Sequence, residues 1–176
     1  MSNDRPAPPH TTLVLGGARS GKSRHAEHLA LNSGRAPVYL ATAQALDDEM
    51  ARRIAAHRAR RGPAWRTVEE PLDLVGALRR ECAPQRIVLV DCLTLWLTNL
   101  MVAGREVEAE SARLLEALPG LSGPVVLVSN EVGQGVVPDN VMARQFLDHA
   151  GSLHQGIAEQ ADAVVFMTAG LPHRLK

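Results

Sequence analysis

The segment that most constrains this chain is a glycine-rich stretch at residues 16–23, with the sequence GGARSGKS. Its spacing fits G-x-x-x-x-G-K-[ST], and it lies between an apolar run at residues 11–15 and a helical pattern that begins at Lys22. In such a loop the glycines let successive backbone N–H groups turn toward an anion, and the following helix adds its positive N-terminus. We expect Lys22 to reach the β- and γ-phosphates and the Ser23 hydroxyl to ligate Mg²⁺. The sequence therefore predicts a nucleoside triphosphate site formed by Gly16, Gly17, Ala18, Arg19, Ser20, Gly21, Lys22 and Ser23.

Short apolar runs alternate with helical patterns along the rest of the chain. We expect strands at residues 11–15, 37–42, 65–69, 86–91, 124–129 and 163–168, the last of these closing the chain, and helices at residues 22–32, 47–61, 71–81, 93–102, 107–118 and 140–160. Apolar strands separated by helices indicate an α/β fold with a mostly parallel sheet and helices on both faces. With the glycine-rich loop, this pattern predicts a fold of the P-loop NTPase type with a RecA-like strand order.

The length of 176 residues suits one domain with its own core. Residues 1–10 are Pro-rich and polar, so we interpret them as a flexible leader, and residues 11–176 as a single nucleotide-binding domain. No window approaches the roughly 20 apolar residues of a membrane span. Cys82 and Cys92 are too far apart for a C-x-x-C site and suit a reducing compartment, so we expect a cytoplasmic protein.

The charge of the chain argues against a nucleic-acid partner. The 19 basic and 19 acidic residues give a formal net charge of zero, whereas nucleic-acid binders carry a basic surplus or stripe. The densest basic stretch, residues 52–61, is interleaved with alanines rather than aromatic residues, which is more typical of a solvated helix face.

The carboxyl ends of the expected strands are where functional groups should gather. Asp91 ends an apolar strand downstream of the phosphate loop, where P-loop enzymes place a carboxylate that holds Mg²⁺ directly or through water. The same rule nominates residues 42–48 and 129–135. Among seven histidines, His149 and His154 are expected near the polar side of the last helix, whereas His57 lies among cations that suit a polyphosphate. From its surroundings alone, His57 fits a surface residue at least as well as a catalytic one.

The chain resembles the bifunctional adenosylcobinamide kinase/adenosylcobinamide-phosphate guanylyltransferase family of cobalamin biosynthesis, from about residue 13 to its end. Besides the phosphate loop, the matching segments are residues 39–42, 47–50, 53–54, 57–58, 65–67, 69, 91–96, 99–100, 129–133, 137–140, 143–144 and 170–172. A phosphate loop alone indicates only a superfamily, whereas this ordered set is much more specific. Ala43, Ser152 and His154 depart from the family, which has Ser or Gly, Arg, and Asn at these places.

The resemblance implies two group transfers. ATP or GTP phosphorylates the aminopropanol hydroxyl of adenosylcobinamide; GTP then guanylylates an enzyme histidine, and GMP passes to adenosylcobinamide phosphate to give adenosylcobinamide-GDP. By its position in the motif, His57 is that histidine, and Arg53 and Arg58 would neutralise phosphate charge. The resemblance also implies a homotrimer and nucleotide contacts from Ala41, Thr42, Ala43, Arg58, Glu69 and Asp91.

Two other functions stay open from the residues alone. One is a P-loop small-molecule kinase in which His57 is only a surface residue, and the family residues between positions 47 and 69 weigh against it. The other is a RecA-like nucleotide-binding module that acts on a macromolecular partner. Zero net charge and the lack of an aromatic and basic surface weigh against this second function.

Overall fold

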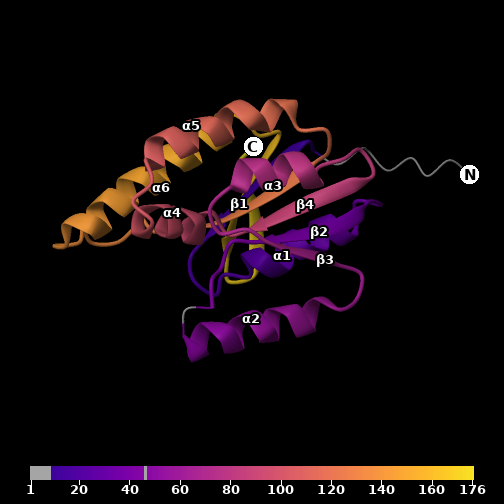
Figure 1. Ribbon diagram of the computed structural model, residues 1–176, viewed down its shortest axis with the longest axis horizontal. Coiled ribbons are helices and arrows are strands. Elements are labelled where there is room, and N and C mark those ends of the chain that lie inside the picture. The colour runs from indigo at the N-terminus through magenta and orange to yellow at the C-terminus, as the bar shows by residue number, and fades with distance from the viewer. Residues whose placement is uncertain (1–8, 46) are drawn as a thin grey trace, which may run out of the picture.

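The computed structural model describes residues 9–45 and 47–176, which form one sheet with helices around it (Figure 1). Residues 1–8 of the expected leader lie outside the described residues. The strands are β1 (Thr11–Gly16), β2 (Ala36–Ala41), β3 (Arg66–Glu69), β4 (Arg86–Asp91), β5 (Val125–Asn130), β6 (Ala163–Thr168) and β7 (Leu171–Arg174). The helices are α1 (Lys22–Leu31), α2 (Asp48–Arg61), α3 (Leu74–Glu81), α4 (Leu93–Val102), α5 (Val107–Ala117) and α6 (Val141–Gln160), with a short 3₁₀ turn, η1 (Leu118–Gly120).

The strands form a single sheet in the order β3-β2-β4-β5-β1-β6-β7. All neighbouring pairs are parallel except β6 with β7. β1 lies between β5 and β6, and every one of its residues is buried. The predicted α/β fold, with its RecA-like order, is confirmed, and the strand that leads into the glycine-rich loop is held on both sides.

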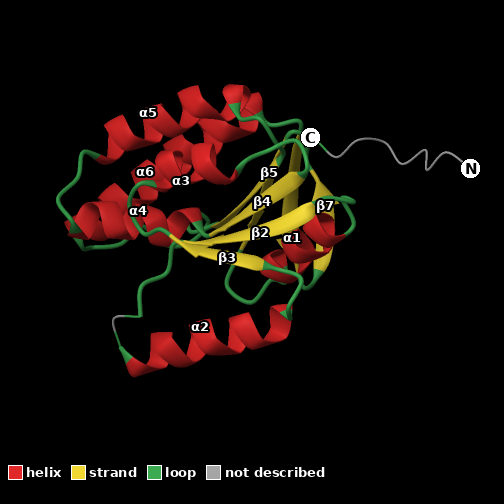
Figure 2. Ribbon diagram, turned by 45° about the vertical axis from the view of Figure 1, so that its right-hand side comes forward, coloured by secondary structure: helices red, strands yellow, loops and turns green. Residues whose placement is uncertain are grey.

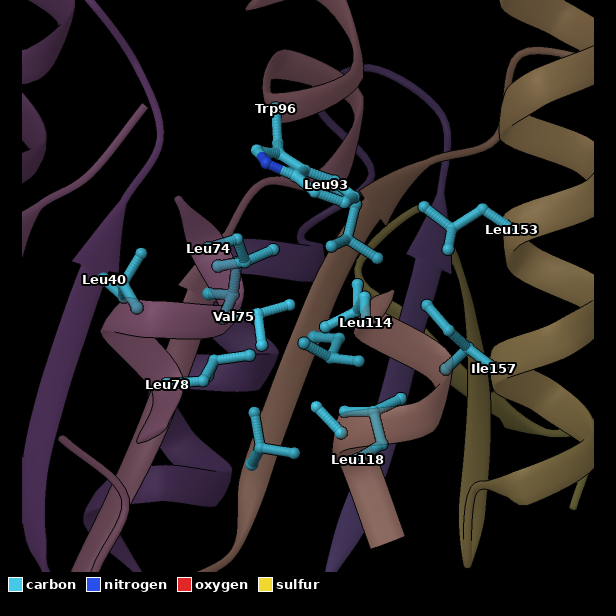
Figure 3. Packing of buried hydrophobic residues seen from close by; sticks show 14 of the residues in the cluster. Leu40, Leu74, Val75, Leu78, Leu93, Trp96, Leu114, Leu118, Leu153 and Ile157 are labelled. Atoms are coloured by element: carbon cyan, nitrogen blue, oxygen red, sulfur yellow. The ribbon is translucent and has the colours of Figure 1, made fainter. Parts of the chain in front are cut away.

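The two faces of the sheet are covered unequally. Alternation along the strands sends Leu13 and Leu15 to one face and Val14 to the other. The first face packs against α3, α4, α5 and α6, whose buried side chains meet in the core drawn in Figure 3. The second face is covered by α1, through Ala26 and Ala30, and by Trp65. Both faces are therefore closed by helices, as predicted, but the second has room for a cavity.

Helix α2 stands apart from this core. In Figures 1 and 2 it runs along the β3 edge of the sheet, separated from the other helices. Its Asp47 N-cap accepts a hydrogen bond from the Met50 N–H at 2.7 Å, and Gly62, at φ 73°, ends it. None of its described side chains is fully buried, and two of them contact the sheet, as described below.

Two expectations were wrong. Helix α3 begins at Leu74 rather than near Pro71, because the Asp73 carboxylate caps it by accepting from the Gly76 N–H at 3.1 Å. The strand at residues 163–168 is not the last one: β7 returns antiparallel to β6 through a turn at Ala169 and Gly170. All four β7 residues are exposed, so no apolar alternation marks this strand in the sequence.

No helix in the described part of the chain is both long enough and apolar enough to cross a membrane.

Candidate functional site: a phosphate loop beside a histidine-lined cavity

The glycine-rich loop lies between β1 and α1, and its shape requires two of its glycines. A Cβ on Gly16 would lie 2.5 Å from Ser20 Oγ and 2.8 Å from the Met167 carbonyl oxygen. Gly21 has φ 93°, a left-handed conformation that side chains rarely adopt, and stands at the N-cap of α1. Tight packing and backbone geometry therefore fix glycine at both positions.

The chain around the loop holds it from two directions. Glu131, just after β5, donates its backbone N–H to the Gly16 carbonyl at 2.9 Å, and Gly170 in the β6–β7 turn donates to the Ser20 carbonyl at 2.9 Å. Ala18 and Arg19 are exposed at the outer edge of the loop, while Ser20 is buried. The loop is thus anchored by the segments that directly follow β5 and β6.

Lys22, the first residue of α1, directs its ammonium group back into the loop. Its ammonium group donates to the Gly17 carbonyl at 2.9 Å, and only 8% of the residue is exposed. Burial lowers the pKa of Lys22, and the nearby Asp91 carboxylate opposes that shift. Lys22 therefore lies close enough to the end of β4 for the charge of Asp91 to act on it.

The register of the sheet aligns the predicted residues of the neighbouring strands. Ala41 at the end of β2 pairs with Glu69 of β3 on one side and with Asp91 of β4 on the other. Parallel strands end at the same edge, so these three positions form one row across the sheet. All three positions therefore lie at the strand ends where functional groups were expected, and their roles stay predictions.

A cavity of about 270 Å³ opens between this row and α2. Six residues singled out from the sequence line it: Ala41, Ala43, His57, Arg58, Glu69 and Asp91. His57 is half-buried, and the Arg58 guanidinium lies 3.8 Å from the Glu69 carboxylate. Met50, Ile54 and Leu95 provide apolar wall. The structure thus brings His57 and Asp91 to one cavity, although 34 residues separate them in the sequence.

Thr42 is placed differently from its two neighbours. It is fully buried, and its hydroxyl donates to the Cys92 carbonyl at 2.8 Å and accepts from the Cys92 N–H at 2.9 Å. These bonds tie the end of β2 to the end of β4. In this structure Thr42 supports the wall of the cavity and does not line it.

Two residues that we did not single out also line the cavity. The Tyr39 hydroxyl donates to Asp91 Oδ2 at 2.9 Å, and the Arg61 guanidinium carbon lies 3.4 Å from the centre of the Tyr39 ring. Burial and the neighbouring Asp91 raise the pKa of Tyr39, so its hydroxyl remains a donor. Arg61 follows His57 at helical spacing i, i+4, and Tyr39 is the only tyrosine of the chain. These two signals could have identified both residues.

Asn130 and His154 lie on the β5 side of the site. Asn130 also lines the cavity, and its amide donates to the Thr94 hydroxyl at 2.9 Å. His154 of α6 is buried rather than on a polar side, and its Nε2 lies 2.7 Å from the Ser129 hydroxyl. Burial lowers the pKa of His154, with Glu131 opposing the shift. The departure from Asn at position 154 therefore replaces one hydrogen-bonding side chain by another beside Ser129.

The residues available to a metal are few. Within the described part of the chain, no group of three or more His, Cys, Asp and Glu residues could hold an ion. Ser23 at the start of α1 and Asp91 are both partly exposed. One hydroxyl and one carboxylate suit Mg²⁺, which usually takes one or two carboxylates together with substrate phosphates. The donor set fits a magnesium–nucleotide complex better than a resident metal.

Comparison with known families and proteins agrees with the sequence resemblance. The family described as cobinamide kinase / cobinamide phosphate guanyltransferase matches residues 12–175. A relative in Pseudomonas aeruginosa, the bifunctional adenosylcobalamin biosynthesis protein CobP, is 57% identical over 166 residues, which cover 93% of this chain and 96% of the relative. In Escherichia coli, the bifunctional adenosylcobalamin biosynthesis protein CobU is 40% identical over 93% of this chain and 98% of its own length.

Similar solved structures extend the fold class. The flagellar accessory protein FlaH from Methanocaldococcus jannaschii has a TM-score of 0.50 at 12% identity, covering 96% of this chain and 79% of its own. An ATPase from a type III secretion system has a TM-score of 0.52 at 9% identity, covering 94% and 56%. At such low identity these likenesses concern the fold alone.

Proposed function

This chain belongs to the cobinamide kinase / cobinamide phosphate guanyltransferase family, and we propose that it carries out both of the reactions that this description names. The observation that carries the proposal is the joint site: a phosphate loop whose Lys22 lies near Asp91, and a cavity that Asp91 and His57 both line. A kinase without a second activity needs only the phosphate loop. The cavity adds His57, a nucleophile for the transfer of GMP.

In the kinase step, the phosphate loop holds the triphosphate of ATP or GTP. The aminopropanol hydroxyl oxygen of adenosylcobinamide attacks the γ-phosphorus, the bond from that phosphorus to the β–γ bridging oxygen breaks, and the nucleoside diphosphate leaves. The hydroxyl proton is released to solvent. Lys22 and the backbone N–H groups of the loop stabilise the charge that moves onto the leaving diphosphate.

In the guanylyl step, a neutral ring nitrogen of His57 attacks the α-phosphorus of GTP. A phosphorus–nitrogen bond forms, the bond to the α–β bridging oxygen breaks, and pyrophosphate leaves. A phosphate oxygen of adenosylcobinamide phosphate then attacks the same phosphorus. The phosphorus–nitrogen bond breaks, the imidazole regains its free nitrogen, and adenosylcobinamide-GDP is formed.

The remaining site residues would position the nucleotide. Arg58 lines the cavity beside His57 and would meet phosphate charge. Glu69 and the backbone of residues 41–43 would contact the guanine or the ribose. Held by Ser23, Asp91 and the substrate phosphates, Mg²⁺ would neutralise charge on the β- and γ-phosphates. The proposal also includes the homotrimer implied by the family resemblance and a cytoplasmic location; it includes no nucleic-acid partner.

The direct test is covalent labelling with GTP that carries the label on the α-phosphate, in the presence of Mg²⁺. We expect wild-type protein to take up acid-labile, alkali-stable label, as a phosphorus–nitrogen bond requires, and GTP labelled on the γ-phosphate to leave none at this histidine. His57→Ala should take up no α-label and keep the rate of cobinamide phosphorylation. A matched control is His149→Ala, which removes a half-buried histidine from α6, on the far side of the sheet from the cavity.

Three results would contradict the proposal. Wild-type protein that takes up no α-label would indicate that the chain has the kinase activity without the guanylyl transfer. Equal labelling of His57→Ala would place the adduct elsewhere. Loss of phosphorylation in a folded His57→Ala variant would mean that His57 serves nucleotide binding generally.

A further inference from the structure

Tyr39 contacts both halves of the site. Its hydroxyl reaches Asp91 at the end of β4, and its ring face meets Arg61, the last residue of α2. The ring also packs against Trp65 in a T-shaped pair, with centroids 5.9 Å apart and planes at 84°. Tyr39 is 5% exposed, so none of these contacts belongs to a loosely held surface side chain.

The contact with Arg61 matters because it joins α2 to a buried residue of the sheet. Among the side chains that the structure describes, none from α2 belongs to the two buried clusters of the core; Arg61 lies on Tyr39, and Arg58 forms an exposed pair with Glu69. An ion pair with both partners more than 60% exposed contributes little. A guanidinium on a buried aromatic ring contributes more, because it is shielded from water. Arg61 lies one helical turn after His57, so its position sets where His57 faces the cavity.

We propose that Tyr39 is a positioning residue for both transfers: its hydroxyl orients the Asp91 carboxylate, and its ring holds α2 through Arg61 so that His57 faces the nucleotide. This inference rests on the proposed function for what the two halves do. The arrangement gives the two functions to different atoms of one side chain. A phenylalanine at position 39 would satisfy the packing against Trp65 and Arg61, but it would leave Asp91 without its donor.

The hydroxyl is tested by Tyr39→Phe, which keeps the ring. Because a hydrogen bond to a charged group stabilises its orientation, its loss should weaken the binding of Mn²⁺ about three- to tenfold in the presence of a non-hydrolysable GTP analogue, measured by electron paramagnetic resonance. Both transfer rates should fall together at limiting metal and recover at high metal. Unchanged Mn²⁺ binding would overturn this half of the inference.

The ring is tested by Arg61→Met and Tyr39→Leu, singly and together. We expect amide hydrogen exchange in residues 48–61 to quicken in both single variants and not in Tyr39→Phe. Guanylylation of His57 should fall about five- to tenfold in Arg61→Met while phosphorylation keeps its rate, and the double variant should lose little more than the worse single one. Arg52→Met, which removes an exposed cation from the same helix, is the matched control and should change neither.

Additive losses in the double variant, or equal loss of both activities in Arg61→Met, would overturn the ring's role. Because Tyr39→Leu removes a buried ring, its exchange data are interpreted only with Arg61→Met, which leaves the core intact. Exchange and Mn²⁺ binding require no guanylyl transfer. A protein that never forms the His57 adduct would therefore refute the proposed function while leaving the positioning role of Tyr39 open to support or refutation by these two measurements.

Discussion

The phosphate loop and helix α2 carry the two halves of the site, and they are held in opposite ways. The loop grows out of β1, which is buried throughout, and receives backbone hydrogen bonds from the segments after β5 and β6. Helix α2 lies at the sheet edge, and the contacts described for it are a stacked guanidinium and an exposed ion pair. The loop expected to hold the triphosphate is thus continuous with the core, whereas His57 is carried by a helix at the periphery. Damage to the first should stop every reaction, and damage to the second only one.

The largest effect is expected from Lys22→Ala. Loss of this cation removes charge stabilisation from both transfers, so the rates of phosphorylation and guanylylation should each fall about 10²–10³-fold. Because the lysine is buried and its pKa is lowered by burial, the thermal midpoint should not fall with the rates. Steady-state assays of both reactions, with circular dichroism as the folding control, check this. A phosphorylation rate that stays at the wild-type level would contradict the expectation that both transfers depend on the phosphate loop.

A smaller and selective effect is expected from Arg58→Met. The exposed pair with Glu69 should contribute under about 0.5 kcal/mol, so the free energy of unfolding in urea should hardly change. Guanylylation should nevertheless fall about tenfold, since a cation beside His57 would meet the α-phosphate in the transition state. Phosphorylation serves as the internal control. If both rates fell alike, α2 would have to contribute to the phosphate loop as well.

The smallest effect is expected from His154→Asn, and it concerns stability and pH. The pKa of His154 is lowered in the fold, so the unfolded chain takes up its proton first. The contribution of neutral His154 to the free energy of unfolding should therefore be fully present above the ordinary histidine pKa of about 6.5. It should decline as the pH falls toward the lowered pKa. Asn keeps a partner for Ser129 without a titrating group, so the variant should lose less stability between pH 7 and pH 5. Urea unfolding at a series of pH values measures the difference, and identical pH profiles would contradict it.

Much of the fold was predictable because burial leaves a strong pattern. The apolar strands and the loop at residues 16–23 follow directly from periodicity and motif. The register that aligns Glu69, Ala41 and Asp91 could not be predicted from the sequence, since it depends on which strands become neighbours. β7 was missed because its four exposed residues carry no alternation, and the start of α3 was misplaced because the Asp73 cap competes with Pro71 as a start signal.

The site was predictable in its residue types and less so in its connections. His57, Arg58, Glu69 and Asp91 were named, and the structure gathers them at one cavity. Their roles stay predictions. The side chain of Arg53, also named for phosphate charge, lies outside the described part of the chain. Tyr39 was counted in the matching segment 39–42 but given no role in the site, because an aromatic residue in a buried strand is usually explained by packing alone.

The turn between β6 and β7 has a consequence for how the protein is made. Gly170 donates to the loop that contains Ser20, and β1 is flanked by strands from residues 125–130 and 163–168. A nascent chain therefore carries the glycine-rich segment before the strands that flank it have been made. The loop can take its final shape only after synthesis has passed Gly170, so triphosphate binding should report that β5, β6 and the following turn have folded onto β1.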